Sequence, residues 1–455
     1  MNHVLSTEVV HDPSGGLTQW PEDHGLRPID LSVIISVKAE DRVEMIAVPH
    51  GRRAPRTGVH RADLQLSATA IRDLADRLRG QWHAFVHHQP VDADGMPYGP
   101  RYPFAADHDL RPARDIVLPM IEDLARSGDR TLRRILSGAD RDLEWFREFL
   151  LGELRREGLR ISFDSRDLSL PWPMFAVRTD DSATPAFLGH RHEIDQTGAS
   201  YAPVYSPAAR PVPVTSLNTD TALDAAGRSE DVAALLRRRS RLTVRTHADD
   251  LLKSLADAEF DEDLMYFWCH GAFNEYGAHR TVGIRLSDDK VIDADRVHEH
   301  REEAGTGQGS VFRPFVLLNA CHAGVPAATA ELEYLGRAFI KHGATGVLGP
   351  QIEIPQVFAS EYAHAFLDRY LSGSRTAGEI CRDLARHFLD DLHNPLALAY
   401  LLYCGIDSVL EIRPCTSPPL TSTNEDGSAR PTAAVPSQAI GSPNISPSTS
   451  APRTG

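Results

Sequence analysis

Two short apolar runs constrain the fold of this chain most, because each leads directly to a residue capable of acid–base or nucleophilic chemistry. The first run, Leu264–Trp268, leads to His270, and the second, Phe315–Leu318, leads to Cys321. A short continuous apolar run is typical of a strand buried on both faces, and such strands occur mainly in parallel α/β sheets. Two neighbouring parallel strands would bring His270 and Cys321 to the same carboxyl edge, where ligand crevices form.

The two residues together form a minimal nucleophile and base. A free cysteine has a pKa of about 8.5, so its reactive thiolate is scarce at neutral pH unless an imidazole accepts or stabilises the proton. His270 precedes Cys321 by about 50 positions, the order and spacing of the caspase signature. Cys269 lies within the apolar run and on the opposite strand face from His270, so we expect it in the core.

Several further stretches resemble the caspase-like cysteine peptidases, and more closely their CHAT branch. The Leu-Pro-Trp segment at 170–172 is similar to one found in many CHAT domains. Together the similar stretches cover much of residues 160–410. Besides Leu170–Trp172 they are Tyr266–Gly271, Leu317–Cys321, Leu335–Phe339, His342–Ala344, Asn394-Pro395, Tyr400 and Gly405.

The resemblance implies a cysteine endopeptidase with a His270–Cys321 dyad. The Cys321 thiolate would attack the scissile carbonyl and His270 would protonate the leaving amine. The backbone N–H groups of Gly271 and Cys321 would hold the oxyanion, a role that main-chain donors fill with any side chain. The chain departs from caspases at Asn319, where they have Gln. Asn319 is therefore a substrate-binding candidate, and the preferred residue before the cleaved bond stays open.

The same resemblance implies a caspase-like three-layer α/β/α sandwich with a mostly parallel central sheet. From Val212 onward, strand and helix patterns alternate, as parallel strands with right-handed crossovers require. We expect four regions along the chain. They are a loose leader at 1–29, an α+β non-catalytic lobe at 30–158, the protease domain at 159–412, and a disordered tail rich in Pro, Ser and Thr at 413–455.

Local patterns predict further elements. The amino-terminal lobe should contain a hairpin at Leu31–Val37 and Val43–Val48 and helices at 113–126, 130–137 and 140–157. The protease domain should contain a polar loop at Asn274–Arg280, a flexible loop at Arg301–Arg313 and a final buried strand at Leu396–Tyr403.

Two patterns suggest a metal or a cofactor without completing the motif. His190, His192 and Glu193 cluster, but the second His of the zinc-protease pattern H-E-x-x-H is missing. The glycine-rich stretch around Gly307 carries Ser310 where a dinucleotide loop needs its third glycine, and no strand precedes it. We therefore expect neither a metal nor a cofactor.

Composition excludes several classes of partner. The formal net charge of −15 argues against nucleic-acid binding, which depends on basic surface. No apolar run approaches the ~18 residues of a membrane span, and the polar start at 1–16 lacks the apolar stretch of a secretory signal. The five cysteines show no C-x-x-C spacing, which fits a reducing compartment. We expect a cytoplasmic protein.

These expectations describe a peptidase that cleaves a protein substrate, is controlled by an activating or sensor protein, and acts in bacterial defence or regulated proteolysis. Two alternatives stay open. The first is a catalytically inactive caspase-like scaffold for protein–protein interaction, and the second is a transpeptidase on the same dyad.

Overall fold

A large mixed β-sheet organises the part of the chain that the computed structural model describes. The described residues are 27–50, 58–165, 167–179, 184–198, 210–224, 227–276, 279–305, 312–321 and 335–412. The main sheet runs β9-β8-β10-β13-β14-β15-β7-β4-β1-β2-β3, and β11 and β12 pair beyond β10. The expected leader and tail fall almost entirely outside the described residues.

The sheet contains two parallel blocks. Strands β9, β8, β10, β13 and β14 are parallel to one another, as are β15, β7, β4 and β1, and the blocks meet at the antiparallel pair β14–β15. The strands are β1 Leu31–Val37, β2 Val43–Pro49, β3 His60–Asp63, β4 Arg160–Ser165, β7 Glu193–Thr197, β8 Val214–Thr219, β9 Arg241–Arg245, β10 Leu264–Tyr276, β11 His279–Arg285, β12 Val291–Ile292, β13 Phe315–Cys321, β14 Gly346–Pro350 and β15 Tyr400–Tyr403. The short strands β5 Ala176–Val177 and β6 Ala186–Phe187 form a separate pair.

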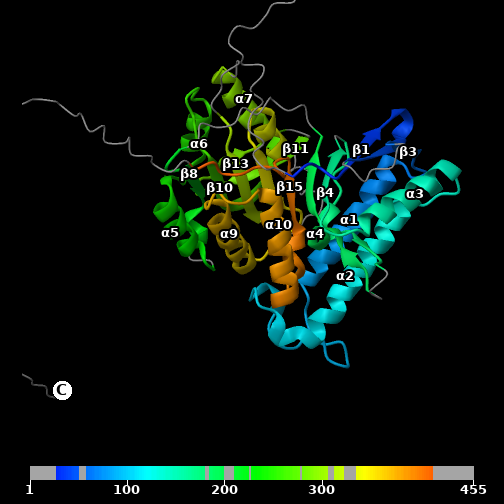
Figure 1. The fold of residues 1–455 in the computed structure, drawn as a ribbon. Coiled ribbons are helices and arrows are strands. Elements are labelled where there is room, and N and C mark those ends of the chain that lie inside the picture. The colour runs from blue at the N-terminus through cyan, green and yellow to red at the C-terminus, as the bar shows by residue number, and fades with distance from the viewer. Residues whose placement is uncertain are drawn as a thin grey trace, which may run out of the picture. The chain divides into compact units, whose positions relative to one another are not determined.

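Helices surround both ends of this sheet (Figure 1). Helices α1 Ala68–Val86, α2 Arg114–Ile135 and α3 Arg141–Leu154 gather beside β1–β4, and α4 Leu188–Arg191 follows β6. Helices α5 Ser229–Arg239, α6 Ala248–Leu255, α7 Ala294–Glu303, α9 Gln356–Tyr370 and α10 Ala377–Arg386 accompany the later strands. Among the described residues, no helix is both long and apolar enough to cross a membrane.

Strand β10 is buried on both faces, as its apolar run predicted. Leu264, Tyr266 and Trp268 pack into the core that contains α5 and α9, whereas Met265 and Phe267 pack into a second core with α6. Each large apolar side chain fully buried in this way contributes about 1.5–3 kcal/mol to folding. A helical layer thus covers each face of the parallel block, which confirms the α/β class and the layered arrangement.

The amino-terminal region shares this sheet. The predicted hairpin is confirmed by the antiparallel pairing of β1 with β2, and β1 also pairs in parallel with β4, where Leu31 lies opposite Ile161. The expected boundary between 158 and 159 therefore falls inside one continuous sheet. Trp172 of the Leu-Pro-Trp segment stacks on Phe163 of β4 with a centroid distance of 3.5 Å, which fixes this segment against the sheet.

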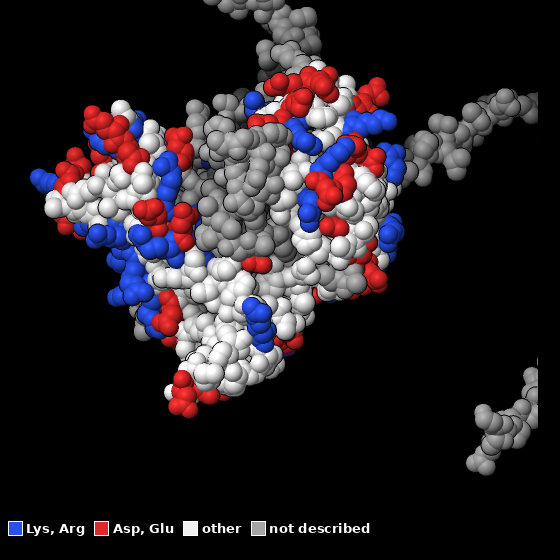
Figure 2. Space-filling model, turned by 180° about the vertical axis from the view of Figure 1, so that it is seen from behind, with Lys and Arg blue, Asp and Glu red and all other residues white. Residues whose placement is uncertain are grey.

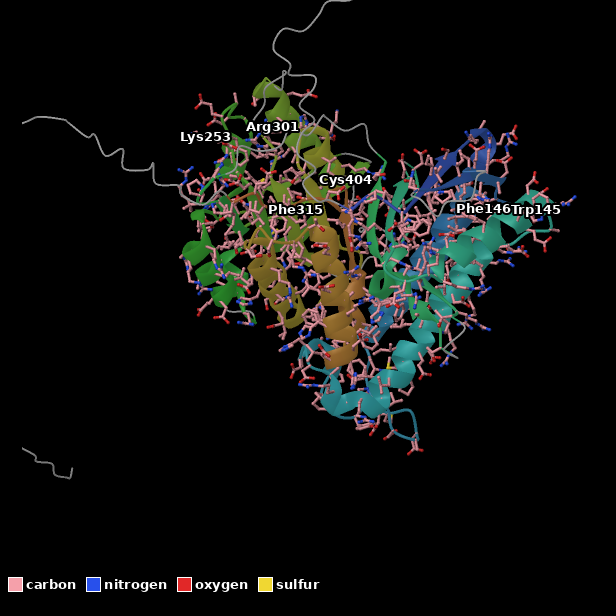
Figure 3. The ribbon with its side chains drawn as sticks, viewed as in Figure 1. Trp145, Phe146, Lys253, Arg301, Phe315 and Cys404 are labelled. Atoms are coloured by element: carbon pink, nitrogen blue, oxygen red, sulfur yellow. The ribbon has the colours of Figure 1, made fainter. Side chains whose placement is uncertain are left out.

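Helix α2 is a single helix where two were predicted. The expected break lay near Gly128, but this glycine allows a close approach rather than a turn, because a Cβ there would lie 2.5 Å from the Met174 carbonyl oxygen. On α3, Phe146 is in the core and its neighbour Trp145 is exposed (Figure 3). The buried face of this helix also carries Leu143, Leu150 and Leu154.

Three local predictions in the protease region were wrong. The polar residues Asn274–Tyr276 and His279-Arg280 belong to the paired strands β10 and β11 rather than to a loop, and 277–278 lie outside the described residues. Arg301 lies inside helix α7, which Asp293 caps by accepting a hydrogen bond from the Arg296 N–H and which continues to Glu303. Residues 306–311 of the expected loop lie outside the described residues. The segment from Pro395 first forms a 3-10 helical turn, because Asn394 caps it and proline suits the first helical position.

Candidate active site

His270 and Cys321 are direct partners in the register of two parallel strands. Strand β10 pairs with β13 from Leu264 opposite Phe315 to His270 opposite Cys321. Neighbouring strands lie about 4.8 Å apart, so the two backbones are adjacent at these positions. Side chains alternate along a strand, so His270 shares the face of Tyr266 and Trp268, which α5 and α9 cover, and Cys269 lies on the other face.

The candidate site lies at the carboxyl edge of the parallel block, and β10 extends beyond that edge. Strand β13 is described to Cys321 and β8 ends at Thr219, whereas β10 continues through His270 and Gly271 to Tyr276. The expectation that His270 lies at the end of its strand was therefore wrong, because the antiparallel partner β11 extends β10. Gly271 lies opposite Ile284 of β11.

Asp220 is a third residue of the site, which the sequence analysis missed. It directly follows β8, and its Oδ2 lies 3.8 Å from Nε2 of His270. The Asp220 side chain is 10% exposed and that of His270 is 33% exposed. The carboxylate is therefore largely buried, whereas solvent reaches the imidazole. A carboxylate in this place orients the ring and stabilises positive charge on it.

The backbone holds Asp220 in place. Its N–H donates to the Trp268 carbonyl at 2.9 Å, and its Oδ1 accepts a hydrogen bond from the Ala222 N–H at 3.0 Å. The strand pattern from Val212 onward did not indicate that this aspartate lies beside His270, because the two residues belong to separate strand segments. The available signal was an acidic residue at the end of a buried strand that precedes the histidine strand.

The Asn319 side chain is buried and hydrogen-bonded within the protein. Its side chain is 1% exposed, its Nδ2 donates to the Ala359 carbonyl at 2.9 Å, and its Oδ1 accepts from the Tyr400 hydroxyl at 2.7 Å. Both ends of the amide are thus bonded to protein groups, and they tie β13 to α9 and β15. The expected substrate contact of Asn319 is therefore replaced by a packing role.

The suspected cluster at His190, His192 and Glu193 does not converge. His192 donates from Nε2 to the Leu154 carbonyl at 3.0 Å and accepts at Nδ1 from the Leu159 N–H at 3.3 Å, so both ring nitrogens are bonded to backbone. Burial lowers the pKa of His192 to about 4. His190 instead faces Asp390, with 2.8 Å between Nε2 and Oδ2.

The surface seen in Figure 2 carries both signs of charge. On the described residues of that face, acidic and basic side chains lie close together at the left and right, and the lower middle is largely uncharged.

An α/β fold whose parallel block places a histidine beside a cysteine at its carboxyl edge is the arrangement of the caspase-like class. The sequence profile of the CHAT domain matches residues 140–381, more than half of the 455 residues. The chain belongs to the CHAT domain family. The match begins at Asp140, ahead of the boundary expected at 158, in agreement with the sheet that crosses it.

The chain is also similar to individual proteins over part of their length. A protein named probable protease from Vitiosangium sp. (strain GDMCC 1.1324) is 27% identical over 140 residues, which are 30% of this chain and 18% of that protein. Two structures of the Saccharomyces cerevisiae separase–securin complex match with TM-scores of 0.39 and 0.37 at 10% identity, over 83% of this chain and 30% of the matched chain. The chain spans less than a third of each of these relatives.

Proposed function

We propose that this protein is a cysteine endopeptidase in which Cys321 is the nucleophile and His270 the general acid and base. The observation that carries the proposal is the register pairing of His270 with Cys321 on β10 and β13. Membership of the CHAT family and the similarity to a protein named probable protease support it. The substrate class is a protein chain.

The proposed mechanism is the one that the resemblance to caspase-like peptidases implies for these residues. The Cys321 sulfur attacks the scissile carbonyl, and the oxyanion that forms accepts hydrogen bonds from the N–H groups of Gly271 and Cys321. His270 transfers a proton to the leaving amine, which departs and leaves a thioester. A water molecule, activated by His270 as a base, then attacks the thioester and releases the second product as a carboxylic acid.

Asp220 completes the mechanism without touching the substrate. Its carboxylate, 3.8 Å from His270, stabilises the imidazolium that forms when His270 takes the proton of the Cys321 thiol, and again when it takes a proton from water. It is therefore a positioning residue.

Alkylation of the thiols tests the proposal without knowledge of the substrate. With limiting iodoacetamide and mass spectrometry of tryptic peptides, we expect Cys321 to react first. Cys269 is fully buried, and burial raises the pKa of the Cys381 thiol to about 12, so both serve as internal controls. His270→Ala should slow alkylation of Cys321 and leave that of Cys381 unchanged. A Cys321 that reacts no faster than Cys381 would contradict the assignment.

We also propose that a partner protein controls the activity in a defence or regulated-proteolysis pathway. An endopeptidase that shares a compartment with its host's proteins needs such control. To raise the catalytically competent fraction of molecules from ~1% to ~99%, the partner must bind the competent state more tightly than the other state by about 5.5 kcal/mol. The test compares turnover of a broad peptide library by the purified protein and in lysate that contains the products of neighbouring genes. Equal rates would remove partner control from the proposal.

A further inference from the structure

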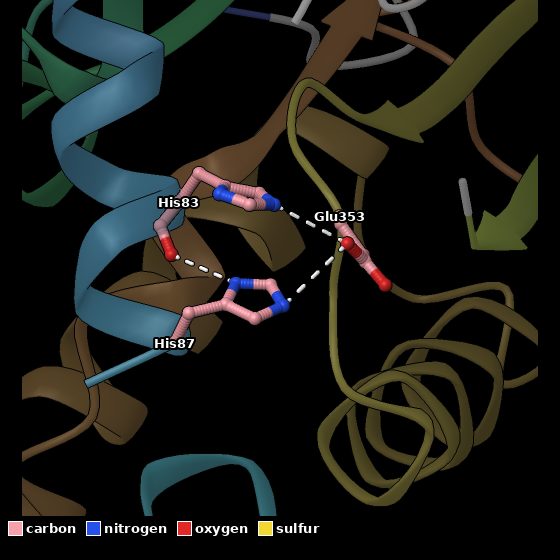
Figure 4. Close-up of side chains that lie close together, drawn as sticks. All are labelled: His83, His87 and Glu353. Atoms are coloured by element: carbon pink, nitrogen blue, oxygen red, sulfur yellow. Dashed lines mark hydrogen bonds and ion pairs between the residues drawn. The ribbon is translucent and has the colours of Figure 1, made fainter. Parts of the chain in front are cut away.

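A second group of chemically active side chains lies away from the dyad, where helix α1 meets the segment between β14 and α9. His83 and His87 come from the last turn of α1, and Glu353 lies three residues beyond the end of β14 (Figure 4). Among the described residues, these three bring one ligand atom each to within 4.8 Å of one another.

The helix places the two imidazoles on one face. Residues four apart on a helix are neighbours, and the rings of His83 and His87 stack with centroids 4.1 Å apart and an interplanar angle of 27°. Their Nε2 atoms converge on the same carboxylate oxygen. Oε2 of Glu353 is 3.3 Å from Nε2 of His83 and 3.8 Å from Nε2 of His87.

These separations suit a metal ion. Zinc binds histidine nitrogen and carboxylate oxygen at ~2.0–2.2 Å, which separates the ligand atoms of a tetrahedral site by about 3.3–3.5 Å. An ion between the three side chains would need only small adjustments of the rings. The side chains are 28%, 29% and 29% exposed, so water has access to the fourth position of the site.

The other nitrogen of His87 supports the same conclusion. Its Nδ1 donates a hydrogen bond to the His83 carbonyl at 3.1 Å, the backbone contact that commonly orients a metal-binding histidine. Nε2 is then the ring atom that His87 directs toward the Glu353 carboxylate, and a metal ion between the two side chains would bind both.

The segment that carries Glu353 is itself anchored to α1. Arg79, one turn before His83, donates to the Ser169 carbonyl at 2.9 Å and to Oε1 of Gln351 at 3.5 Å. The backbone N–H of Gln351 donates to the Ala399 carbonyl at 2.9 Å. Glu353 is therefore held near the two histidines without any metal, which lowers the ordering cost of a site built from distant parts of the chain.

We propose that His83, His87 and Glu353 form a zinc-binding site with water as the fourth ligand. The two nitrogen donors and one oxygen donor favour zinc over magnesium or calcium, which prefer oxygen ligands. The bound ion clamps α1 to the segment that leads from β14 into α9. Helix α9 in turn contacts β13 through the hydrogen bond from Asn319 to Ala359. The ion therefore adds a second connection, besides the shared sheet, between the amino-terminal region and the strands of the candidate site.

The experiment uses the full chain, freed of metal with a chelator and titrated with Zn²⁺ alone. Isothermal titration and mass spectrometric metal analysis should give one zinc ion per chain for the unmodified protein, and zinc should raise its thermal midpoint. His87→Ala and Glu353→Gln should each raise the dissociation constant for zinc at least ~10-fold. Even mutations of residues that only hydrogen-bond to a metal ligand weaken metal affinity by that factor. Thermal midpoints without zinc show whether each variant is folded.

His88→Ala is the matched control. His88 lies next to His87 but stacks on Phe104, with ring centroids 4.9 Å apart, and is outside the group of three. It should bind zinc as the unmodified protein does. Absence of stoichiometric zinc binding, or unchanged affinity in both His87→Ala and Glu353→Gln, would overturn the proposal. Neither result bears on the reactivity of Cys321.

Discussion

Asp220 places its carboxylate 3.8 Å from the imidazole of His270, and it follows β8, which pairs with β10 on the side away from β13. The contact joins residues whose strands, β8 and β10, pair in parallel with Thr219 opposite Trp268. A carboxylate at this distance stabilises an imidazolium through Coulomb attraction. Under the proposed mechanism, Asp220 therefore adds a third group to the pair of His270 and Cys321.

Asp220→Asn should therefore slow the chemistry of Cys321. We expect a loss on the order of 10–100-fold in peptide cleavage, less than the full effect of a general acid–base group because the histidine remains. The pH profile of Cys321 alkylation should shift as well, which a purely structural role would not cause. Asp224→Asn changes an exposed aspartate four residues away and should leave the profile unaltered. Identical profiles in both variants would exclude the positioning role.

His270→Ala and Cys321→Ala should each abolish peptide cleavage, and the double variant should be no worse than either one. Nucleophile and base act as a unit, so removal of one already eliminates the covalent route. Cleavage is followed by mass spectrometry of products, and thermal midpoints report whether the variants are folded. Products that still form with Cys321→Ala would refute the dyad.

The protein should lose stability in mild acid through His192. The pKa of this buried histidine is about 4 in the folded chain, against an ordinary value of 6.5, because burial disfavours the charged ring. Between these pH values the unfolded chain binds a proton that the folded chain does not. The contribution is thus fully present above pH ~6.5 and is lost as the pH falls toward ~4, by about 3 kcal/mol in total.

Denaturant unfolding at a series of pH values measures this effect. His192→Gln should reduce the dependence of unfolding free energy on pH by up to ~1.4 kcal/mol per pH unit in that interval. His190→Gln serves as the comparison, because His190 is partly exposed and pairs with Asp390. Equal slopes for His192→Gln and the unmodified protein would show that His192 is not the group responsible.

Glu193 should matter more for stability than any surface acid. Its buried carboxylate accepts hydrogen bonds from Arg160 at 2.9 Å and from Arg382 at 2.8 Å. Glu193→Ala would leave the buried Arg160 with only Asp407, and such losses cost about 3–5 kcal/mol. Glu122→Ala removes an exposed partner of Arg126 and should cost ~1 kcal/mol or less. Chemical denaturation compares the two, and similar losses would contradict the argument.

Two glycines in helices should respond to alanine in opposite ways. Gly128→Ala would bring a Cβ within 2.5 Å of the Met174 carbonyl oxygen, and we expect a loss of about 1–3 kcal/mol. Gly152 of α3 has open space at the same position, so Gly152→Ala should stabilise the protein by roughly 0.5–1 kcal/mol through helix propensity. Thermal midpoints should therefore move in opposite directions, and a shift of the same sign would contradict the packing argument.

The sequence predicted the parts of the site that depend on short-range patterns. Two continuous apolar runs indicated the strands β10 and β13. The register of these strands, with Leu264 opposite Phe315, brings His270 opposite Cys321. The hairpin of β1 and β2 followed from alternation. Burial of Asn319 was not predicted, because its partners Ala359 and Tyr400 come from distant elements that no local pattern connects to it.

Contacts between distant segments account for the remaining misses. Asp220 follows β8, and its place beside His270 depends on the pairing of β8 with β10. The helix break expected between 126 and 130 is absent, and the close approach of the Met174 carbonyl to Gly128 cannot be read from the local pattern. His83 and Glu353 are 270 residues apart and come from segments with no shared motif. Only the tertiary structure shows that they converge.

The central position of β15 has a consequence for the order in which the protein is made. This strand pairs with β14 on one side and with β7 on the other, so it is the joint between the two parallel blocks. Every other strand of both blocks precedes it in the chain. A ribosome must therefore release Tyr400–Tyr403 before the halves of the sheet can be connected. Until then both blocks expose an unpaired edge, and this long-range closure favours slow folding and a need for chaperones during synthesis.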